Sequence, residues 1–188
     1  MSASRWIDAM IDDLVVREGD YVDHPADRGG PTRWGITEAV ARAHGYAGSM
    51  RALPKATARQ IYWTTYVVAP GIGTLAQRSP RLAAEALDTG VNMGATRGVA
   101  MLQRALNALN NGGRDWPDLA KVDGQWGGKS DAALAGCQRR RAREQWEDVL
   151  LAAMNVQQGD RYLDIIDRNP SQEAFGWGWF RARVLAAA

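Results

Sequence analysis

The sequence predicts a mainly α fold in two lobes, with at most a small β-hairpin near residues 19–36. Apolar residues recur at the three- and four-residue steps of amphipathic helices along most of the 188-residue chain. There is no strand-rich region, no βαβ alternation, no phosphate loop and no internal repeat. Glycine and proline gather between two helical patterns at residues 19–36, so any sheet should be confined to that stretch.

The first predicted helix has one apolar face, formed by Trp6, Ile7, Met10, Ile11, Leu14 and Val15. Glu18 is the next position on that face. Burial there would disfavour the ionised carboxylate and raise its pKa, as a general acid requires near neutral pH. The alternative is an ordinary last-turn glutamate that pairs with Arg17.

The loop after this helix supplies a second acid, Asp27, and a hydroxyl, Thr32. Its glycines permit backbone conformations closed to other residues, and its prolines stiffen the turns. Such a loop can fold back over the end of a helix. Two carboxyl groups that flank a cleft are the usual equipment of glycoside hydrolysis.

The run from Glu18 to Thr37, EGDYVDHPADRGGPTRWGIT, resembles the signature of the glycoside hydrolase 108 muramidases, E-G-G-Y-V-x-D-P-x-D-x-G-G-x-T-x-x-G-I-T. The spacing of Glu18, Asp27 and Thr32 is also similar to that of the catalytic Glu, Asp and Thr of T4-type phage lysozymes. This resemblance implies a lysozyme-like fold that hydrolyses the β-1,4 bond between N-acetylmuramic acid and N-acetylglucosamine. It makes Glu18 the proton donor, while Asp27 and Thr32 position water or stabilise the charged sugar.

Aromatic side chains near this loop suit a sugar cleft, and we expect Tyr21, Trp34 and Tyr66 to bind substrate. Tyr62 and Tyr66 share one face of a predicted helix that ends at Pro70, so core packing is the alternative for them. Before that helix, Thr37 can cap a short helix that runs through Ala43.

Residues 70–80, PGIGTLAQRSP, are rich in helix breakers and predict a connection between lobes. Two helical patterns follow, and the turn between them precedes a Leu-Gln pair. In the resembled family a D-x-x-x-N-x-G segment followed by Leu-Gln recurs, which matches Asp88, Asn92 and Gly94, then Leu102 and Gln103. The resemblance makes Asn92 and Gln103 candidate substrate contacts; capping of a helix end by Asn92 is the alternative.

The run VDGQWGGKS resembles an element of small helical peptidoglycan-binding domains, with Trp126 as its candidate sugar contact. Asp123 and Gly124 would otherwise shape a turn, and Ser130 would cap the next helix. The resemblance therefore assigns residues 1–90 to a muramidase lobe and residues 91–188 to a helical peptidoglycan-binding lobe.

One long helix is expected after Ser130, with an arginine run at Arg139, Arg140, Arg141 and Arg143. Such a run is either a solvated helix face or a means of attraction to an anionic envelope polymer. Nucleic-acid binding is not expected, because no groove-reading or base-stacking motif accompanies it. Further on, Trp177 lies between two glycines and is a candidate cleft aromatic.

Composition limits the remaining possibilities. The net charge is only +2, and Cys137 is the single cysteine, so no intramolecular disulfide can form. Two histidines with one cysteine give no zinc spacing, and we expect neither metal nor cofactor.

Aspartates within the first apolar pattern argue against a signal peptide, and no apolar run is long enough for stable membrane insertion. We therefore expect synthesis in the cytoplasm, release by a holin or secretion system, and action on glycan strands of the periplasmic cell wall. The alternatives are a lytic transglycosylase and a non-catalytic peptidoglycan-binding module.

Overall fold

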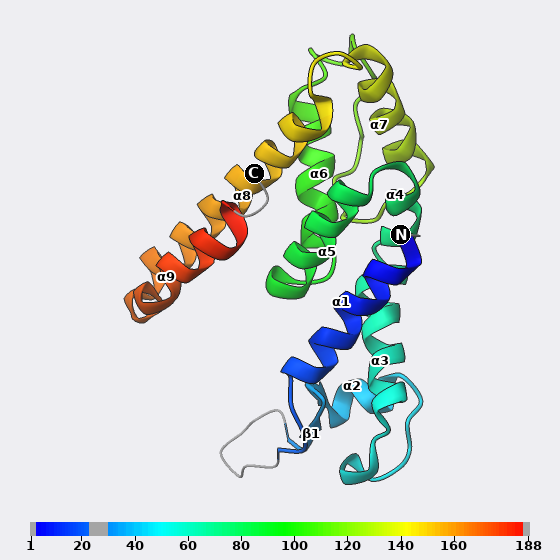
Figure 1. Cartoon of the computed structure of the whole chain (residues 1–188), viewed down its shortest axis with the longest axis vertical. Helices are drawn as coiled ribbons and strands as arrows, with labels where there is room; N and C mark the ends of the chain where they lie inside the picture. The colour runs from blue at the N-terminus through cyan, green and yellow to red at the C-terminus, as the bar shows by residue number, and fades with distance from the viewer. Residues whose placement is uncertain (1–2, 23–29, 186–188) are drawn as a thin grey trace. The chain divides into compact units, whose positions relative to one another are not determined.

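Helix α1 (Ala3–Arg17) opens the computed structural model, which describes residues 3–22 and 30–185. The predicted mainly α, lysozyme-like architecture is confirmed: helices dominate the described chain, and its one sheet has two short strands (Figure 1). The chain forms two compact units, Met1–Val68 and Ala69–Ala188.

The first unit is built on α1 and α3 (Lys55–Trp63), which pack side by side (Figure 1). Their shared core holds the apolar face predicted for α1, including Ile7, Ile11 and Leu14, against Ala58 and Ile61 of α3. At the edge of this contact the guanidinium of Arg59 binds the carboxylates of Asp8 and Asp12, which ties α3 to α1.

A two-stranded hairpin follows α1. Strands β1 (Thr32–Arg33) and β2 (Ile36–Thr37) are antiparallel, with Thr32 opposite Thr37 and Arg33 opposite Ile36. Helix α2 (Glu38–Ala43) begins directly afterwards, and the Thr37 hydroxyl accepts the Val40 amide at 3.4 Å, which confirms the predicted cap. A short 3-10 turn, η1 (Met50–Ala52), leads to α3, and a π-helical turn, η2 (Thr64–Val68), continues it.

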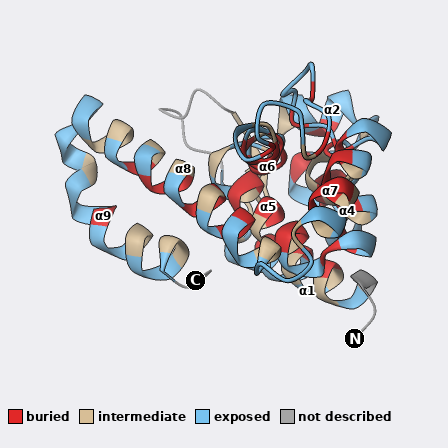
Figure 2. Cartoon of the chain, turned by 90° about the horizontal axis from the view of Figure 1, so that it is seen from above, coloured by how far each residue is buried: buried red, intermediate tan, exposed pale blue. Residues whose placement is uncertain are grey.

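The second unit centres on three helices: α4 (Ile72–Arg78), α5 (Pro80–Met93) and α6 (Arg97–Ala108). Figure 2 shows buried residues concentrated on α5 and α6. The two helices approach closely at Gly98, where an added β-carbon would lie 2.1 Å from the carbonyl oxygen of Ala86. Helix α4 corrects the prediction of a bare connection at residues 70–80. The breakers lie at helix ends: Gly71 precedes α4, and Pro80 is the first residue of α5.

The helix expected after Ser130 is in fact two helices, α7 (Gly128–Arg140) and α8 (Trp146–Arg168). Ser130 is not the cap, because α7 begins two residues earlier. The break at residues 141–145 includes Gln145, which has a left-handed φ of 50°.

After α8 the chain turns through η3 (Pro170–Gln172) into α9 (Glu173–Trp179) and the π-helical turn η4 (Phe180–Val184). Helix α9 and η4 pack back on α8, where Trp179 stacks on Tyr162 with ring centroids 5.0 Å apart. None of the described helices is both long and apolar enough to cross a membrane.

Candidate active site

Glu18 lies one residue beyond the end of α1, and its amide still donates to the carbonyl of Leu14 at 3.1 Å. Its side chain is exposed, so the expected burial of this carboxyl group on an apolar face is wrong. The apolar face of α1 ends with Val15, and the turn at Glu18 lifts the carboxyl group out of the core.

The stem of Glu18 packs against the hairpin turn at Gly35. A β-carbon at Gly35 would lie 2.8 Å from both Cβ and Cγ of Glu18, and closer still to the Tyr62 hydroxyl. Gly35 also has a left-handed φ of 72°. Only glycine therefore fits here without displacing Glu18 or straining the turn.

Trp34 precedes Gly35 and adopts a left-handed φ of 53°, an uncommon conformation for a bulky residue. Two left-handed residues in succession make a tight turn whose twist matches that of a two-stranded hairpin. The Trp34 indole donates to the carbonyl of Leu53 at 3.1 Å. The backbone carbonyl of Trp34 accepts a hydrogen bond from the Tyr62 hydroxyl at 2.9 Å. These bonds hold the turn beside Glu18.

Tyr62 and Tyr66 form the wall next to Glu18. Their rings stack with centroids 5.9 Å apart. Burial raises the pKa of both phenols, and the nearby charge of Glu18 raises each further. Both hydroxyls are therefore neutral hydrogen-bond donors near a carboxylate. Tyr66 was predicted as a site residue. The sequence pattern allows Tyr62 to be a core or a cleft aromatic, and its four-residue spacing from Tyr66 places both on one helix face.

Thr32, the predicted hydroxyl, is half-buried on β1. Its backbone exchanges two hydrogen bonds of 2.8 Å with Val22, and its hydroxyl donates to the Gly30 carbonyl at 3.1 Å. Tyr21 lies nearby in sequence, with the Arg51 guanidinium 4.3 Å above its ring. Asp27 lies outside the described residues.

Gln103, a candidate substrate contact, is fully buried on α6, and this prediction is wrong. Its amide nitrogen donates to Asp123, to the Gln125 carbonyl and to Ser130, while its oxygen accepts the Gly124 amide at 2.9 Å. The amide therefore has a structural role: it fixes the turn at residues 123–125.

Trp126, the other candidate in this region, is only 5% exposed. Its amide donates to the Pro70 carbonyl at 2.8 Å, and its side chain packs at Gly71. This burial leaves no indole face for a sugar, so the prediction of a direct contact is corrected to a packing role.

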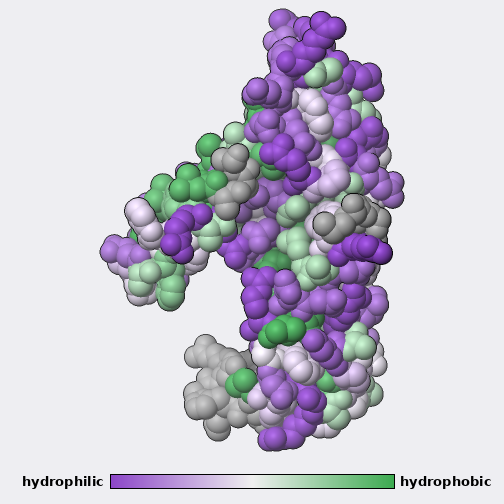
Figure 3. All heavy atoms as spheres, viewed as in Figure 1, coloured by the Kyte–Doolittle hydropathy of each residue, from purple (hydrophilic) through white to green (hydrophobic). Residues whose placement is uncertain are grey.

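Two other candidates from the second unit lie at the surface. Asn92 is exposed and donates to the carbonyl of Asp88 at 2.6 Å, one helical turn earlier. Trp177 is 83% exposed on α9. Apolar surface is visible on part of the α8 and α9 segment (Figure 3).

The arginine run is divided by the break between α7 and α8. Arg140 and Arg141 both bind the carboxylate of Asp115, whose side chain is only 6% exposed. Half of the run therefore anchors a buried carboxylate while the two arginine side chains remain 59% and 31% exposed, so the run is not simply a solvated helix face. Across the described ranges no group of His, Cys, Asp and Glu forms a metal-binding cluster.

Comparisons with known proteins match the N-terminal and the C-terminal half of the chain to two different family models. Residues 11–94 match the family model described as glycosyl hydrolase 108, and residues 97–184 match a model described as a predicted peptidoglycan domain. Among solved structures, one described as the structure of SagA from Brucella abortus is 27% identical. The match covers 97% of this chain and 92% of that chain, with a TM-score of 0.59. No curated protein matches.

Proposed function

Because the chain is a peptidoglycan hydrolase that joins a glycosyl hydrolase 108 domain to a peptidoglycan domain, we propose that it acts as an N-acetylmuramidase. It cleaves the β-1,4 bond between N-acetylmuramic acid and N-acetylglucosamine. The observation that carries this proposal is the placement of Glu18, whose stem is fixed against Gly35 beside two neutral phenols.

Glu18 is the general acid in this mechanism. Its carboxyl group is exposed, so a glycosidic oxygen can reach it, while the packing of its stem limits its motion. Proton transfer to the leaving oxygen needs a donor held within hydrogen-bond reach of that atom. The neutral Tyr66 phenol is available to bind a sugar hydroxyl next to it, and Tyr21 and Trp34 are proposed to bind further parts of the glycan.

The second half of the mechanism falls to Asp27 and Thr32. The Thr32 hydroxyl hydrogen is used by the Gly30 carbonyl, so its oxygen remains an acceptor for a water molecule. Asp27 is proposed to remain ionised and to stabilise positive charge on the sugar or to activate that water. Asp27→Asn should then cut turnover severely, and activity close to that of the parent would assign Asp27 to loop shape alone.

Glu18→Gln tests the assignment directly. The amide is close in size but cannot donate an acidic proton, so wall degradation should fall by about 10²–10⁴-fold while the fold is retained. Glu38→Gln is the matched control, because Glu38 lies in the same unit and forms only an ion pair with Arg42 on α2. Release of soluble muropeptides measures the loss of wall degradation, and circular dichroism shows whether the fold is retained. Retention of more than about a tenth of the activity would remove Glu18 from the mechanism.

Wall lysis by a phage enzyme and wall remodelling for secretion are the two settings we propose, with a holin or a secretion system providing passage to the wall. Expression in bacteria together with a membrane pore should cause lysis that Glu18→Gln abolishes. Asn92 and Trp177 are proposed glycan contacts of the second unit, because both are exposed. Lysis that persists with Glu18→Gln would argue against a bacteriolytic role for this site.

A further inference from the structure

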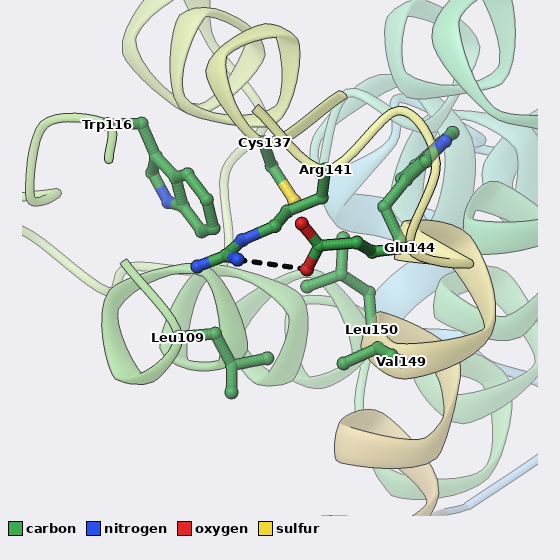
Figure 4. A pocket seen from close by; sticks show the side chains of 8 residues that line it. Leu109, Trp116, Cys137, Arg141, Glu144, Val149 and Leu150 are labelled. Atoms are coloured by element: carbon green, nitrogen blue, oxygen red, sulfur yellow. Dashed lines mark hydrogen bonds and ion pairs between the residues drawn. The ribbon is translucent and has the colours of Figure 1, made fainter. Parts of the chain in front are cut away.

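A cavity of about 180 Å³ lies in the second unit, away from every residue assigned above to substrate (Figure 4). Its lining comes from the residue after α6, the loop before α7, α7 itself, the break at residues 141–145 and the start of α8. Most of that lining is apolar, and it is formed by Leu109, Trp116, Cys137, Trp146, Val149 and Leu150. Two charged side chains, Arg141 and Glu144, complete it.

The apolar floor of the cavity is rigid. The Trp116 indole donates to the Leu106 carbonyl at 3.0 Å. Gly136 allows Trp116 to approach α7, since a β-carbon there would lie 2.6 Å from Cβ of Trp116. Burial raises the pKa of the Cys137 thiol to about 11, so this side chain is neutral near pH 7. The floor therefore presents a preformed, uncharged surface.

The charged side chains are paired. The Arg141 guanidinium binds the nearly buried carboxylate of Asp115 at 2.6 Å. It also binds the more exposed carboxylate of Glu144 at 2.9 Å (Figure 4). Because the guanidinium has five N–H groups, two bonds leave further donors free, and a carboxylate that accepts one bond keeps further lone pairs. The pair therefore offers one donor and one acceptor side by side.

The ion pair of Arg141 and Glu144 favours a neutral ligand group over an anion or a cation. An anion would have to compete with Asp115 and Glu144 for Arg141, and a cation would have to compete with Arg141 for Glu144. A neutral group with a carbonyl, an N–H and a methyl group meets no such competition. An acetamido group has these three features, and the cavity has room for it together with part of a sugar ring.

We propose that this cavity binds the N-acetyl group of one amino sugar in the glycan strand. Arg141 donates to the acetamido carbonyl, Glu144 accepts its N–H, and the methyl group enters the apolar floor between Trp116 and Leu150. The inference rests on the proposed function for the identity of the polymer. It gives the second unit a specific glycan subsite separate from the chemistry at Glu18.

The test uses the full chain with Glu18→Gln, so that sugars are not cleaved, and the β-1,4-linked trimer of N-acetylglucosamine as the probe. NMR signals of the indole N–H groups and of the Leu109 and Val149 methyl groups should shift on titration. The β-1,4-linked glucose trimer lacks acetamido groups and should bind at least about tenfold more weakly, since hydrogen bonds to charged groups are lost.

Two variants on α8 locate the binding. Val149 is 47% exposed at the cavity, so Val149→Trp should fill it without disturbing the core and weaken binding by about tenfold or more. Val156→Trp is the matched control, two turns along the same helix and 70% exposed, and binding should change less than twofold. Glu144→Ala should weaken binding of the N-acetylglucosamine trimer and leave that of the glucose trimer unchanged.

The outcomes separate this inference from the proposed function. Equal binding by Val149→Trp and Val156→Trp, equal binding of the two trimers, or a response only to a free stem peptide would each overturn the acetamido site. Failure of the Glu18 proposal leaves these titrations unaffected.

Discussion

Two glycine turns in this molecule look alike locally and serve different purposes. Gly35 and Gly124 both have left-handed φ values, 72° and 73°, and a β-carbon at either would collide with a neighbour. At Gly35 the neighbour is the stem of the exposed Glu18. At Gly124 it is the backbone of Thr96, and the Gly124 amide is bound by the buried Gln103.

The difference shows how to separate chemistry from architecture in such motifs. Around Gly124 the buried groups, which are the Gly124 amide, Gln103 and Ser130, are bound to each other, and the exposed Asp123 carboxylate accepts from Gln103. The polar groups around Gly35 include an exposed carboxyl group and phenols held close to it. Both turns stand out in sequence, but only the hydrogen-bond partners and the exposure of the side chains show which turn holds a carboxyl group free for a ligand.

The largest stability effect is expected at the buried turn. Gln103→Leu keeps similar volume but leaves the Gly124 amide, Ser130 and Asp123 without their shared partner. The free energy of unfolding should fall by about 3 kcal/mol. Gln125→Leu is the control, because this neighbouring side chain is exposed, and it should change stability by less than about 0.5 kcal/mol.

Urea denaturation of the full chain measures both variants. If Gln103→Leu lowered the free energy of unfolding by less than about 1 kcal/mol and also weakened glycan binding, Gln103 would contact substrate after all. The turns at Gly35 and Gly124 would then both serve the substrate.

A smaller stability effect with a large loss of activity is expected at the other turn. Gly35→Ala combines a left-handed alanine, which costs about 1–2 kcal/mol, with displacement of Glu18 and Tyr62. Gly30→Ala is matched in backbone conformation, with a φ of 68°, but no described atom lies within 4 Å of the added carbon.

Gly35→Ala should therefore lose more stability than Gly30→Ala, because it also displaces Tyr62, and it should lose about a hundredfold more turnover because the acid is misplaced. Thermal unfolding and muropeptide release check these expectations. Equal activity in both variants would show that the contact between Gly35 and Glu18 does not position the acid.

A third prediction concerns pH and the second unit. Glu85 on α5 is half-buried; burial raises its pKa, and the neighbouring charge of Asp88 raises it further. The folded protein therefore binds this proton more tightly than the unfolded chain does. Glu85 contributes stability that is fully present below its unfolded pKa and is lost as pH rises through the raised folded pKa.

Glu85→Gln should accordingly flatten the fall in stability as pH rises above the unfolded pKa of about 4. Glu173→Gln, on the exposed start of α9, should leave the pH dependence unchanged. Urea midpoints at several pH values measure the pH dependence of stability. If wild type and Glu85→Gln showed the same dependence, the raised pKa of Glu85 would be contradicted.

Much of the fold follows from local patterns. The apolar face of α1, the cap at Thr37 and the hairpin after Pro31 were predictable because each depends on a few neighbouring residues. The α7 to α8 break was not, because Arg140 and Arg141 are held there by Asp115, 25 and 26 residues earlier. Helix α4 was missed because glycine and proline indicate helix ends as readily as loops.

The site was only partly predictable for the same reason. Glu18 and Thr32 are proposed as site residues because they belong to a contiguous motif. The burial of Trp126 depends on packing at Pro70 and Gly71, and the part of Tyr62 in holding the Trp34 turn depends on a contact 28 residues away in sequence. Neither is encoded by local periodicity.

We propose that this chain hydrolyses the muramic acid linkage with Glu18 as the acid. Mass analysis of wall fragments released in heavy-oxygen water tests this mechanism, with wild type and Glu18→Gln compared side by side. Wild type should produce new reducing N-acetylmuramic acid ends that each carry one heavy oxygen, and Glu18→Gln should produce almost none. Anhydro-muramic ends without label, reducing N-acetylglucosamine ends, or cleaved peptides would contradict it.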